Sequence, residues 1–371
     1  MDILSIVILV FSVLGAVDRI IGNKLGIGSE FEKGFHLLGS MALSMIGMIV
    51  LAPVLADLLR PVFDFTADVL HLDPSIIPSS LFANDMGGAP LSVEVARDTD
   101  IGLFNALVVS SMMGCTISFT IPFALGMVKK EHHREVILGL LSGIVTIPVG
   151  CLAAGLVAGI GILPLLLDLL PLSLFAAVIA AGLLLCPNLS VKIFSVFGTF
   201  IKILITLGLV LGIAQFLLKR EVLPGLESIE EGGLVCLNAA IVMTGMFPLI
   251  NLVSRLLSRP LRALGRRVGI NEHSAVGFVS SMATSMTTFG FMDKMDDKGI
   301  MLNSAFAVSA AFTFAGHLAF TMAFDSAYIL PMVVGKLVAG VLALVLAFLL
   351  YPKVKRKAAP AEVSADAPTE A

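Results

Sequence analysis

The chain has 371 residues, of which 57% are hydrophobic and 14% charged, with a formal net charge of −3 and a mean hydropathy of +1.01. A soluble protein of this length carries roughly a quarter charged residues and does not repeat apolar runs matched to the ~30 Å hydrocarbon core of a bilayer. The composition therefore excludes an ordinary soluble domain and predicts an all-α polytopic membrane protein.

Nine uninterrupted apolar runs are long enough to cross a membrane as helices. In chain order they cover residues 2–21, 34–59, 101–128, 136–161, 163–186, 193–218, 232–254, 300–325 and 327–351. The first run continues into Asp18 and Arg19 without a basic leader or a small-residue cleavage site, so we interpret it as a span rather than a cleaved signal.

Two further segments, residues 74–96 and 272–292, are too short or too interrupted by Gly, Pro, Ser and Thr to be ordinary spans. Each follows a short amphipathic stretch. Irregular backbone is tolerated at membrane depth only where protein or a water-filled cavity surrounds it. We therefore expect both segments to be re-entrant or broken helices, which in transporters surround the substrate site.

Basic residues predict the orientation of the spans, because Lys and Arg accumulate in cytoplasmic loops. One set of loops holds Lys129, Lys130, Arg134, Arg255, Arg259, Arg262, Arg266, Arg267 and the basic cluster of residues 353–357. The other set holds Arg60, Arg97, Lys219 and Arg220. We therefore expect the N-terminus outside and the C-terminus inside, with residues 353–371 as a disordered cytoplasmic tail rich in Ala, Pro and acids.

The sequence also resembles itself at an offset of about 200 residues. The stretch GIGSEFEKG before the second run matches GLESIEEGG before the seventh, and ANDMGG (83–88) falls on ATSMTT (283–288). Because one unpaired span lies between the copies, the second must enter the membrane upside down. We predict two inverted repeats, residues 1–161 and 191–352, joined by a linking helix at residues 162–190.

Asp85 is the most informative residue of the first broken segment. A carboxylate at membrane depth costs several kcal/mol unless it is paired, hydrated or protonated, so it is a functional hypothesis by default. Gly87, Gly88 and Pro90 allow the backbone beside it to unwind and expose carbonyl groups, and Asn84 adds an amide. These features predict a cation-binding site.

The second broken segment offers hydroxyl groups instead of charge. We predict substrate contacts from Thr284, Ser285, Thr287 and Thr288. A ligand between the two segments would meet one acidic side and one hydroxyl-rich side, which suits a small molecule with an amine and an alcohol. Asn105 and Asn303 occupy equivalent positions in the two copies and either line the site or connect helices.

Other interpretations of these polar residues remain open at this stage. Asp85 can also cap a half-helix or pair with Arg97. His317 is a candidate for proton coupling because imidazole titrates near neutral pH, or else a hydrogen-bonded structural residue. Lys336, deep in the last run, is a candidate counter-ion for an acid or a structural lysine.

Several chemistries have no support in the sequence. It contains no H-E-x-x-H, P-loop or G-x-S-x-G motif, so we predict no enzyme activity, metal or cofactor, and no nucleic-acid partner. The four cysteines lie in or at the end of apolar runs without a C-x-x-C pair and are predicted to be buried free thiols.

Five stretches resemble the ethanolamine utilization permease family, EutH, in the same order along the chain. They are NDMGGAPLSVEVA, SSMMGCTISFTIPFALG, GIVTIPVGC, LNSAFAVSAAF and PMVVGKLVAG, and the resemblance covers residues 1–352. It implies a bacterial inner-membrane protein that takes up ethanolamine for catabolism, and it assigns no binding residue.

Ethanolamine fits the predicted site, because a primary amine titrates near the pKa of lysine and is a cation at neutral pH. The alternatives are a carrier of another small amine and, from a different class, a membrane sensor or scaffold for the catabolic machinery. The only other partner expected is membrane lipid. The sequence leaves open the oligomeric state, a homo-oligomer included, and whether transport is passive or coupled to protons or sodium.

Overall fold

A computed structural model describes residues 3–358 of the chain. Residues 353–358 of the predicted disordered tail are helical, as the end of α17 (Ile329–Ala358), and the rest of the tail, residues 359–371, falls outside the described residues. Every regular element in the described part is helical and no β-strand occurs there. The all-α class is therefore confirmed.

The first half of the chain contains long helices separated by a broken segment. Its helices are α1 (Ile3–Ile20), α2 (Gly28–Leu58), α3 (Arg60–Asp68), α4 (Ile76–Leu81), the 3₁₀ turn η1 (Asn84–Met86), α5 (Gly88–Val95), α6 (Thr99–Phe104), the π-helical stretches η2 (Asn105–Gly114) and η3 (Thr116–Thr120), α7 (Ile121–Met127), η4 (Lys130–His132), α8 (His133–Ile144) and α9 (Ile147–Val157).

The second half of the described chain also contains long helices and a broken segment. Its helices are α10 (Ile162–Leu185), α11 (Pro187–Leu218), α12 (Ile229–Val268), α13 (Glu272–Ala283), α14 (Ser285–Gly290), η5 (Met292–Lys294), α15 (Asp297–Ala310), α16 (Gly316–Phe324), η6 (Ser326–Tyr328) and α17 (Ile329–Ala358).

Seven helical segments in the described part are long and apolar enough to cross a membrane. They are Gly28–Leu58, Thr99–Met127, Lys130–Val157, Ile162–Leu185, Pro187–Leu218, Ile229–Leu256 and Ser326–Tyr351. Of the two remaining predicted spans, residues 2–21 coincide with α1, whereas residues 300–325 are interrupted between α15 and α16. The chain is thus a multi-pass membrane protein.

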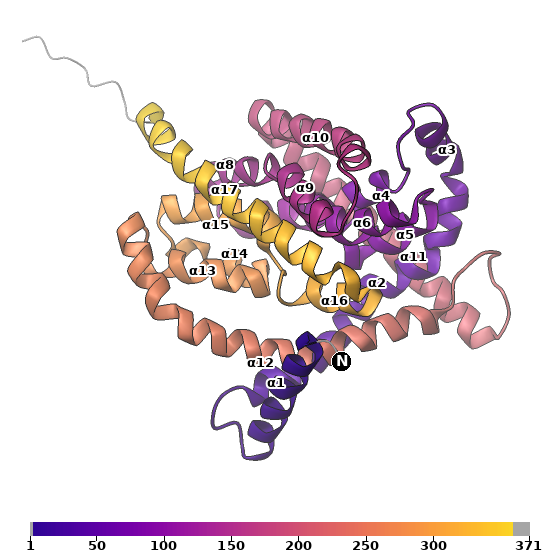
Figure 1. The fold of residues 1–371 in the computed structure, drawn as a ribbon, viewed down its shortest axis with the longest axis horizontal. Helices are drawn as coiled ribbons and strands as arrows, with labels where there is room; N and C mark the ends of the chain where they lie inside the picture. The colour runs from indigo at the N-terminus through magenta and orange to yellow at the C-terminus, as the bar shows by residue number, and fades with distance from the viewer. Residues whose placement is uncertain (1–2, 359–371) are drawn as a thin grey trace, which may run out of the picture.

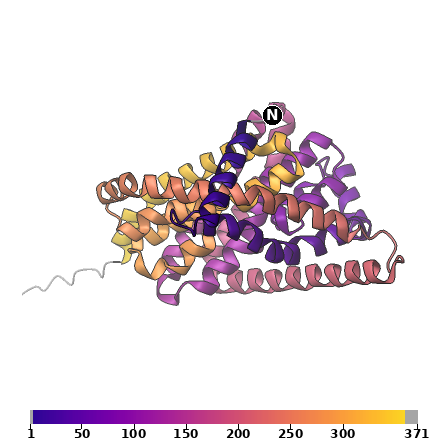
Figure 2. The ribbon, with the colours of Figure 1, turned by 90° about the horizontal axis from the view of Figure 1, so that it is seen from below.

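The two halves of the chain pack against each other through contacts between long helices. In Figure 1, α12 runs along the lower edge of the molecule and α1 crosses it, and these two helices are in contact. Helix α11 packs against α2 and forms the long lower helix of Figure 2. The contact between α2 and α12 joins these two pairs at the centre of the molecule.

Close helix contact at this centre depends on glycine. A Cβ added to Gly47 on α2 would lie 1.9 Å from the carbonyl oxygen of Ile205 on α11, and one on Gly208 would lie 2.0 Å from the carbonyl oxygen of Gly47. A Cβ on Gly34 of α2 would lie 2.6 Å from the backbone nitrogen of Thr244 on α12. Small residues allow helix backbones to approach in this way, as is common between membrane helices.

Each predicted broken segment consists of two short helices joined by non-helical backbone. In the first, α4 ends at Leu81 and the chain is extended at Phe82 before η1 and α5 begin. In the second, the extended residue is Thr284, with φ −158° and ψ 126°. Figure 1 places α4 and α5 on one side of the molecule and α13 and α14 on the other.

The helix that follows each broken segment is irregular at its middle. In the first half it takes the π-helical form of η2 and η3, and a Cβ on Gly114 there would lie 1.9 Å from the carbonyl oxygen of Phe82. In the second half residues 311–315 interrupt the helix, and Phe312 has a φ of +60°, which is rare for a bulky residue. The Phe312 N–H donates to the Ser281 carbonyl at 3.0 Å. Each broken segment is therefore held against an interrupted helix.

The prediction that all four cysteines are buried was wrong for Cys186, which is exposed, while Cys115, Cys151 and Cys236 are buried free thiols. Cys186 is the single residue between α10 and α11, where neither helix covers it.

Candidate functional site

A cavity of about 830 Å³ lies where the two broken segments approach each other. Helices α2 and α12 supply two walls and η1 supplies the third. The rest is closed by α13, α14, the interruption at residues 311–315 and the start of α16. Its polar lining residues are Glu30, Lys33, Ser40, Ser44, Asp85, Asn251, Ser254, Ser280, Thr284, Thr287 and His317. The volume falls within the range of small-molecule sites and exceeds what one small amine fills.

The Asp85 carboxylate faces this cavity and is half-buried. It lies in η1, whose turn is closed by the Met86 N–H donating to the Ala83 carbonyl at 3.0 Å. Gly87 follows with a φ of +103°, a left-handed conformation that favours glycine. This turn directs Asp85 away from the helices and into the cavity.

Gly88 allows the close packing beneath this turn. Its N–H donates to the Ala83 carbonyl at 2.8 Å, and a Cβ at Gly88 would lie 2.2 Å from the carbonyl oxygen of Phe82. Gly87 and Gly88 therefore shape the turn, and neither lines the cavity.

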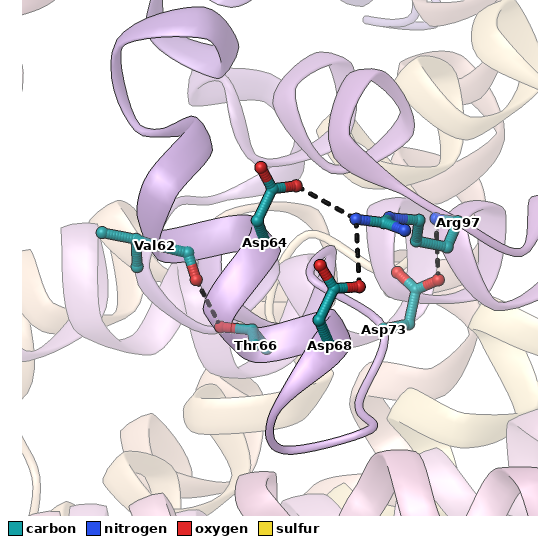
Figure 3. A network of polar contacts seen from close by, with 6 residues as sticks. All are labelled: Val62, Asp64, Thr66, Asp68, Asp73 and Arg97. Carbon is teal, nitrogen blue, oxygen red and sulfur yellow. Dashed lines mark hydrogen bonds and ion pairs between the residues drawn. The ribbon is translucent and has the colours of Figure 1, made fainter.

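Asp85 has no ion pair with another described residue. The alternative partner considered from the sequence, Arg97, instead bridges Asp64 and Asp68 on α3 at 3.0 and 3.5 Å (Figure 3). Asn84 is fully buried, does not line the cavity, and has neither its amide nitrogen nor its oxygen in a hydrogen bond within the described part of the chain. The carboxylate is thus available to a cation from the cavity.

The hydroxyl groups of the second segment divide into two sets. Thr284 and Thr287 line the cavity. Thr288 is fully buried, where it accepts from the Ser281 hydroxyl at 2.9 Å and donates to the Gly277 carbonyl at 3.1 Å. Ser285 is also fully buried and lies outside the lining. Only two of the four predicted hydroxyls therefore face the cavity.

The two ends of the first broken segment are tied together by Asp73. Its Oδ1 accepts from the backbone N–H and hydroxyl of Ser75 at 2.9 and 2.5 Å, and its Oδ2 accepts from the backbone N–H groups of Arg97 and Asp98, both at 2.9 Å. Figure 3 shows Asp73 beside Arg97. The two ends of the first broken segment consequently lie next to each other.

Asn271 connects the ends of the second broken segment in a similar way. Its Oδ1 accepts from the backbone N–H and hydroxyl of Ser274 at 2.9 and 2.8 Å. Its backbone N–H donates to Asp296 and its side-chain amide donates to the Lys294 carbonyl. The two ends of each broken segment therefore lie next to each other.

Asn105 and Asn303 lie next to these ties and do not line the cavity. The Asn105 amide donates to the Ser75 hydroxyl and to Asp168, both at 2.9 Å. The Asn303 amide donates to the carbonyls of Ser274 and Gly299, both at 2.9 Å. Their contacts connect each broken segment to neighbouring helices.

The sequence interpretation passed over Asp168 on α10. This carboxylate is 4% exposed, and its second oxygen has no hydrogen bond within the described residues. An isolated acid inside the apolar run LPLLLDLLP was the signal that could have identified it. Because its other oxygen accepts from Asn105, whose amide also donates to Ser75, it belongs to the packing around the first broken segment.

His317 and Lys336 form a pair at the cavity wall. His317 lines the cavity, and Lys336 lies behind it, where Nζ is 3.0 Å from His317 Nδ1 and donates to the Ser111 carbonyl at 2.7 Å. No cluster of three or more potential metal ligands occurs among the described residues.

The apolar helices, the paired broken segments and the polar cavity between them define a polytopic membrane protein built like a carrier of small solutes. A family model described as "Ethanolamine utilisation protein, EutH" matches residues 1–350. The chain belongs to this family, which confirms the resemblance noted in the sequence.

Curated relatives match over nearly their whole length. The chain is 42% identical over 356 residues to the probable ethanolamine permease EutH of Listeria monocytogenes, covering 96% of this chain and 95% of the relative. It is 37% identical over 402 residues to the protein of the same name from Escherichia coli, covering 98% of each. A Bacillus subtilis relative, the uncharacterized protein YxeR, is 36% identical over 95% of both chains. No solved structure matches the chain.

Proposed function

We propose that this protein is a permease that carries ethanolamine, as the ammonium cation, across the bacterial inner membrane. The observation that carries the proposal is the Asp85 carboxylate, which faces a cavity between two broken helices and has no cationic partner within ion-pair distance among the described residues. The identity of the substrate is suggested by relatives named as probable ethanolamine permeases.

The cavity suits an amino alcohol because the two broken segments that line it supply different chemical groups. Asp85 offsets the hydration that an ammonium group loses on leaving water, since a charge-assisted hydrogen bond is strong where water is excluded. Thr284 and Thr287 on the other broken segment offer hydroxyls that both donate and accept, and so can recognise the alcohol. Asn84 and Ser285 lie buried behind this contact layer. Behind it too, Gly87 and Gly88 shape the turn, and Thr288, Asn105 and Asn303 hold the segments in place.

We assign residues 1–161 and 191–352 to two inverted units joined by residues 162–190, with nine full spans and two re-entrant segments. The exchanged contacts of α1 with α12 and of α11 with α2 support this, as does the tie between the ends of each broken segment. Such units carry substrate by alternating access, in which one unit or bundle moves against the other around a central site.

The loop charges favour an outer N-terminus and a cytoplasmic C-terminus. In this orientation Glu30, Lys33 and Ser254 lie at the cytoplasmic ends of α2 and of the spanning part of α12, and all three line the cavity. Lys33 is substantially exposed, with 54% of its side chain accessible. The cavity thus reaches the cytoplasmic surface, as expected for an inward-facing state.

The test is uptake of labelled ethanolamine into proteoliposomes, with imposed pH and sodium gradients to define coupling. We expect Asp85→Asn to reduce uptake at least about tenfold, equivalent to about 1.4 kcal/mol, because the amide cannot compensate the ammonium charge. Glu94→Gln is the matched control, since Glu94 is an exposed acid in the same broken segment and does not line the cavity.

Uptake by Asp85→Asn equal to that of the wild-type protein would remove this residue from the site. Wild-type vesicles that take up no amine would contradict the permease assignment and favour the sensor or scaffold alternative.

A further inference from the structure

Lys336 is a deeply buried cation close to the cavity. Its side chain is only 1% exposed, and its ammonium donates to the Ser111 carbonyl and to His317 Nδ1. No carboxylate lies within ion-pair distance of it in the part of the chain that the structure describes. A buried lysine without a direct anionic partner carries a costly charge, so its presence here calls for a compensating group.

His317 connects Lys336 to the cavity. An ammonium group has no acceptor, so the 3.0 Å contact requires His317 Nδ1 to accept from Lys336. The imidazole is then neutral with its proton on Nε2, and His317 itself lines the cavity. The Phe312 ring packs beside it with a centroid distance of 5.2 Å and holds the imidazole in this orientation.

Asp85 faces the same cavity as His317, and Lys336 lies directly behind that imidazole, so we assign Asp85 as the charge that compensates Lys336 without direct contact. The other titratable groups facing Lys336 are His317 on α16 and the thiols of Cys115 and Cys151. With these groups neutral, Asp85 and Lys336 together carry one negative and one positive charge when no substrate is bound. A second cation would leave the site with an excess positive charge in a medium of low dielectric constant.

We propose that Lys336 is the site's exchangeable cation, which loses a proton when an ammonium substrate binds at Asp85. In this step the Nζ–H bond of Lys336 breaks and the proton passes to His317 Nδ1, while the Nε2 proton of His317 leaves to water in the cavity. The imidazole stays neutral and its Nδ1–H then donates to the neutral lysine amine. One cation enters and one proton leaves, so the charge of the site is unchanged.

This inference rests on the proposed function and deepens it, because it makes substrate binding dependent on pH. If binding releases one proton, the apparent affinity for the ammonium form rises up to about tenfold for each unit of pH while Lys336 is protonated. If Lys336 only held Ser111 and His317 in place, the protein would bind substrate without releasing a proton.

The experiment is calorimetric titration of the purified full-length protein with ethanolamine near neutral pH, in two buffers of different ionisation enthalpy. The dependence of the heat on the buffer measures protons released. For the wild-type protein we expect about one proton per amine bound. For Lys336→Met we expect binding without proton release, and an affinity independent of pH.

A matched control separates this effect from the loss of any membrane lysine. Lys202 lies on α11 with an exposed side chain, and Lys202→Met should keep the wild-type proton release. If Lys336→Met does not fold, Lys336→Gln tests the same prediction with a polar side chain.

Two results would overturn the inference while leaving the permease assignment intact. The first is binding by the wild-type protein without proton release. The second is proton release by the folded Lys336 variants equal to that of the wild type, which would mean that the proton comes from a group other than Lys336. Absence of ethanolamine binding to the wild-type protein would contradict the proposed function and this inference together.

Discussion

The two broken segments share a framework and differ in charge. In both, a polar residue at the start joins the two ends, Asp73 in the first and Asn271 in the second. Both are interrupted at an extended residue and contact an irregular helix. Only the first, however, directs a carboxylate into the cavity. We therefore propose that the shared geometry builds the site, and that Asp85 decides which kind of solute it favours.

We expect the largest effect from Gly88→Ala, which disturbs the turn of the first broken segment and so tests its role in the comparison. The new Cβ would lie 2.2 and 2.8 Å from the carbonyl oxygens of Phe82 and Ala83, and backbone atoms cannot move aside cheaply. We expect a loss of about 3 kcal/mol or more in the free energy of unfolding, together with loss of uptake.

The matched control is Gly290→Ala at the end of α14, where an added Cβ meets no heavy atom within 4 Å. It should leave stability nearly unchanged. The chain has no tryptophan, so a thiol-reactive dye suits the measurement, because unfolding exposes the buried Cys115, Cys151 and Cys236. Equal melting temperatures for the two variants would contradict the packing argument.

A smaller effect is expected when the ends of the segments are released. Asp73→Ala removes a carboxylate that accepts four hydrogen bonds, and should destabilise the protein by about 2–3 kcal/mol. Asn271→Ala removes a neutral amide and should cost about 1 kcal/mol.

Hydrogen exchange measured by mass spectrometry would locate these changes. Faster exchange should appear in residues 74–96 for Asp73→Ala and in residues 272–292 for Asn271→Ala. Changes spread evenly over the protein would argue against a local tie in each segment.

We expect the smallest effects from substitutions of two threonines that are adjacent in sequence, one acting on half-saturation and the other on stability. Thr287→Val removes a hydroxyl from the cavity, and should raise the half-saturating concentration of ethanolamine by up to about tenfold without loss of stability. Thr288→Val removes a buried hydroxyl that bonds to Ser281 and Gly277, and should cost about 1 kcal/mol of stability with little change in half-saturation. The opposite pattern would show that the substrate lies on the other face of α14.

Much of the fold could be predicted from local sequence, because a bilayer imposes local requirements. An apolar run must be long enough to cross, and backbone that departs from a helix must be shielded, so the segments 74–96 and 272–292 could be recognised from their Gly, Pro and hydroxyl content alone. The interruption at residues 311–315 was missed. It lies inside an apolar run, and the N–H groups of Phe312 and Phe314 there donate to carbonyls of α13, a contact that local composition does not reveal.

The candidate site was predictable to a different degree. Asp85, Thr284 and Thr287 face the cavity, as their polarity in an apolar chain suggested. Gly87 and Gly88 shape the turn, whereas Asn105 and Asn303 connect helices at a distance from it. Composition identifies polar residues that need a partner, but it does not say whether that partner is a ligand or another helix.

By itself the sequence determined that the chain is a helical membrane protein with two broken segments and an acid in one of them, since each of these follows from the cost of transferring particular residues into lipid. Only the tertiary structure decided that Lys336 meets His317, that Asp168 meets Asn105, and that Thr287 and Thr288 face different surroundings. These pairings depend on which faces of distant helices come together, and packing between helices sets that choice.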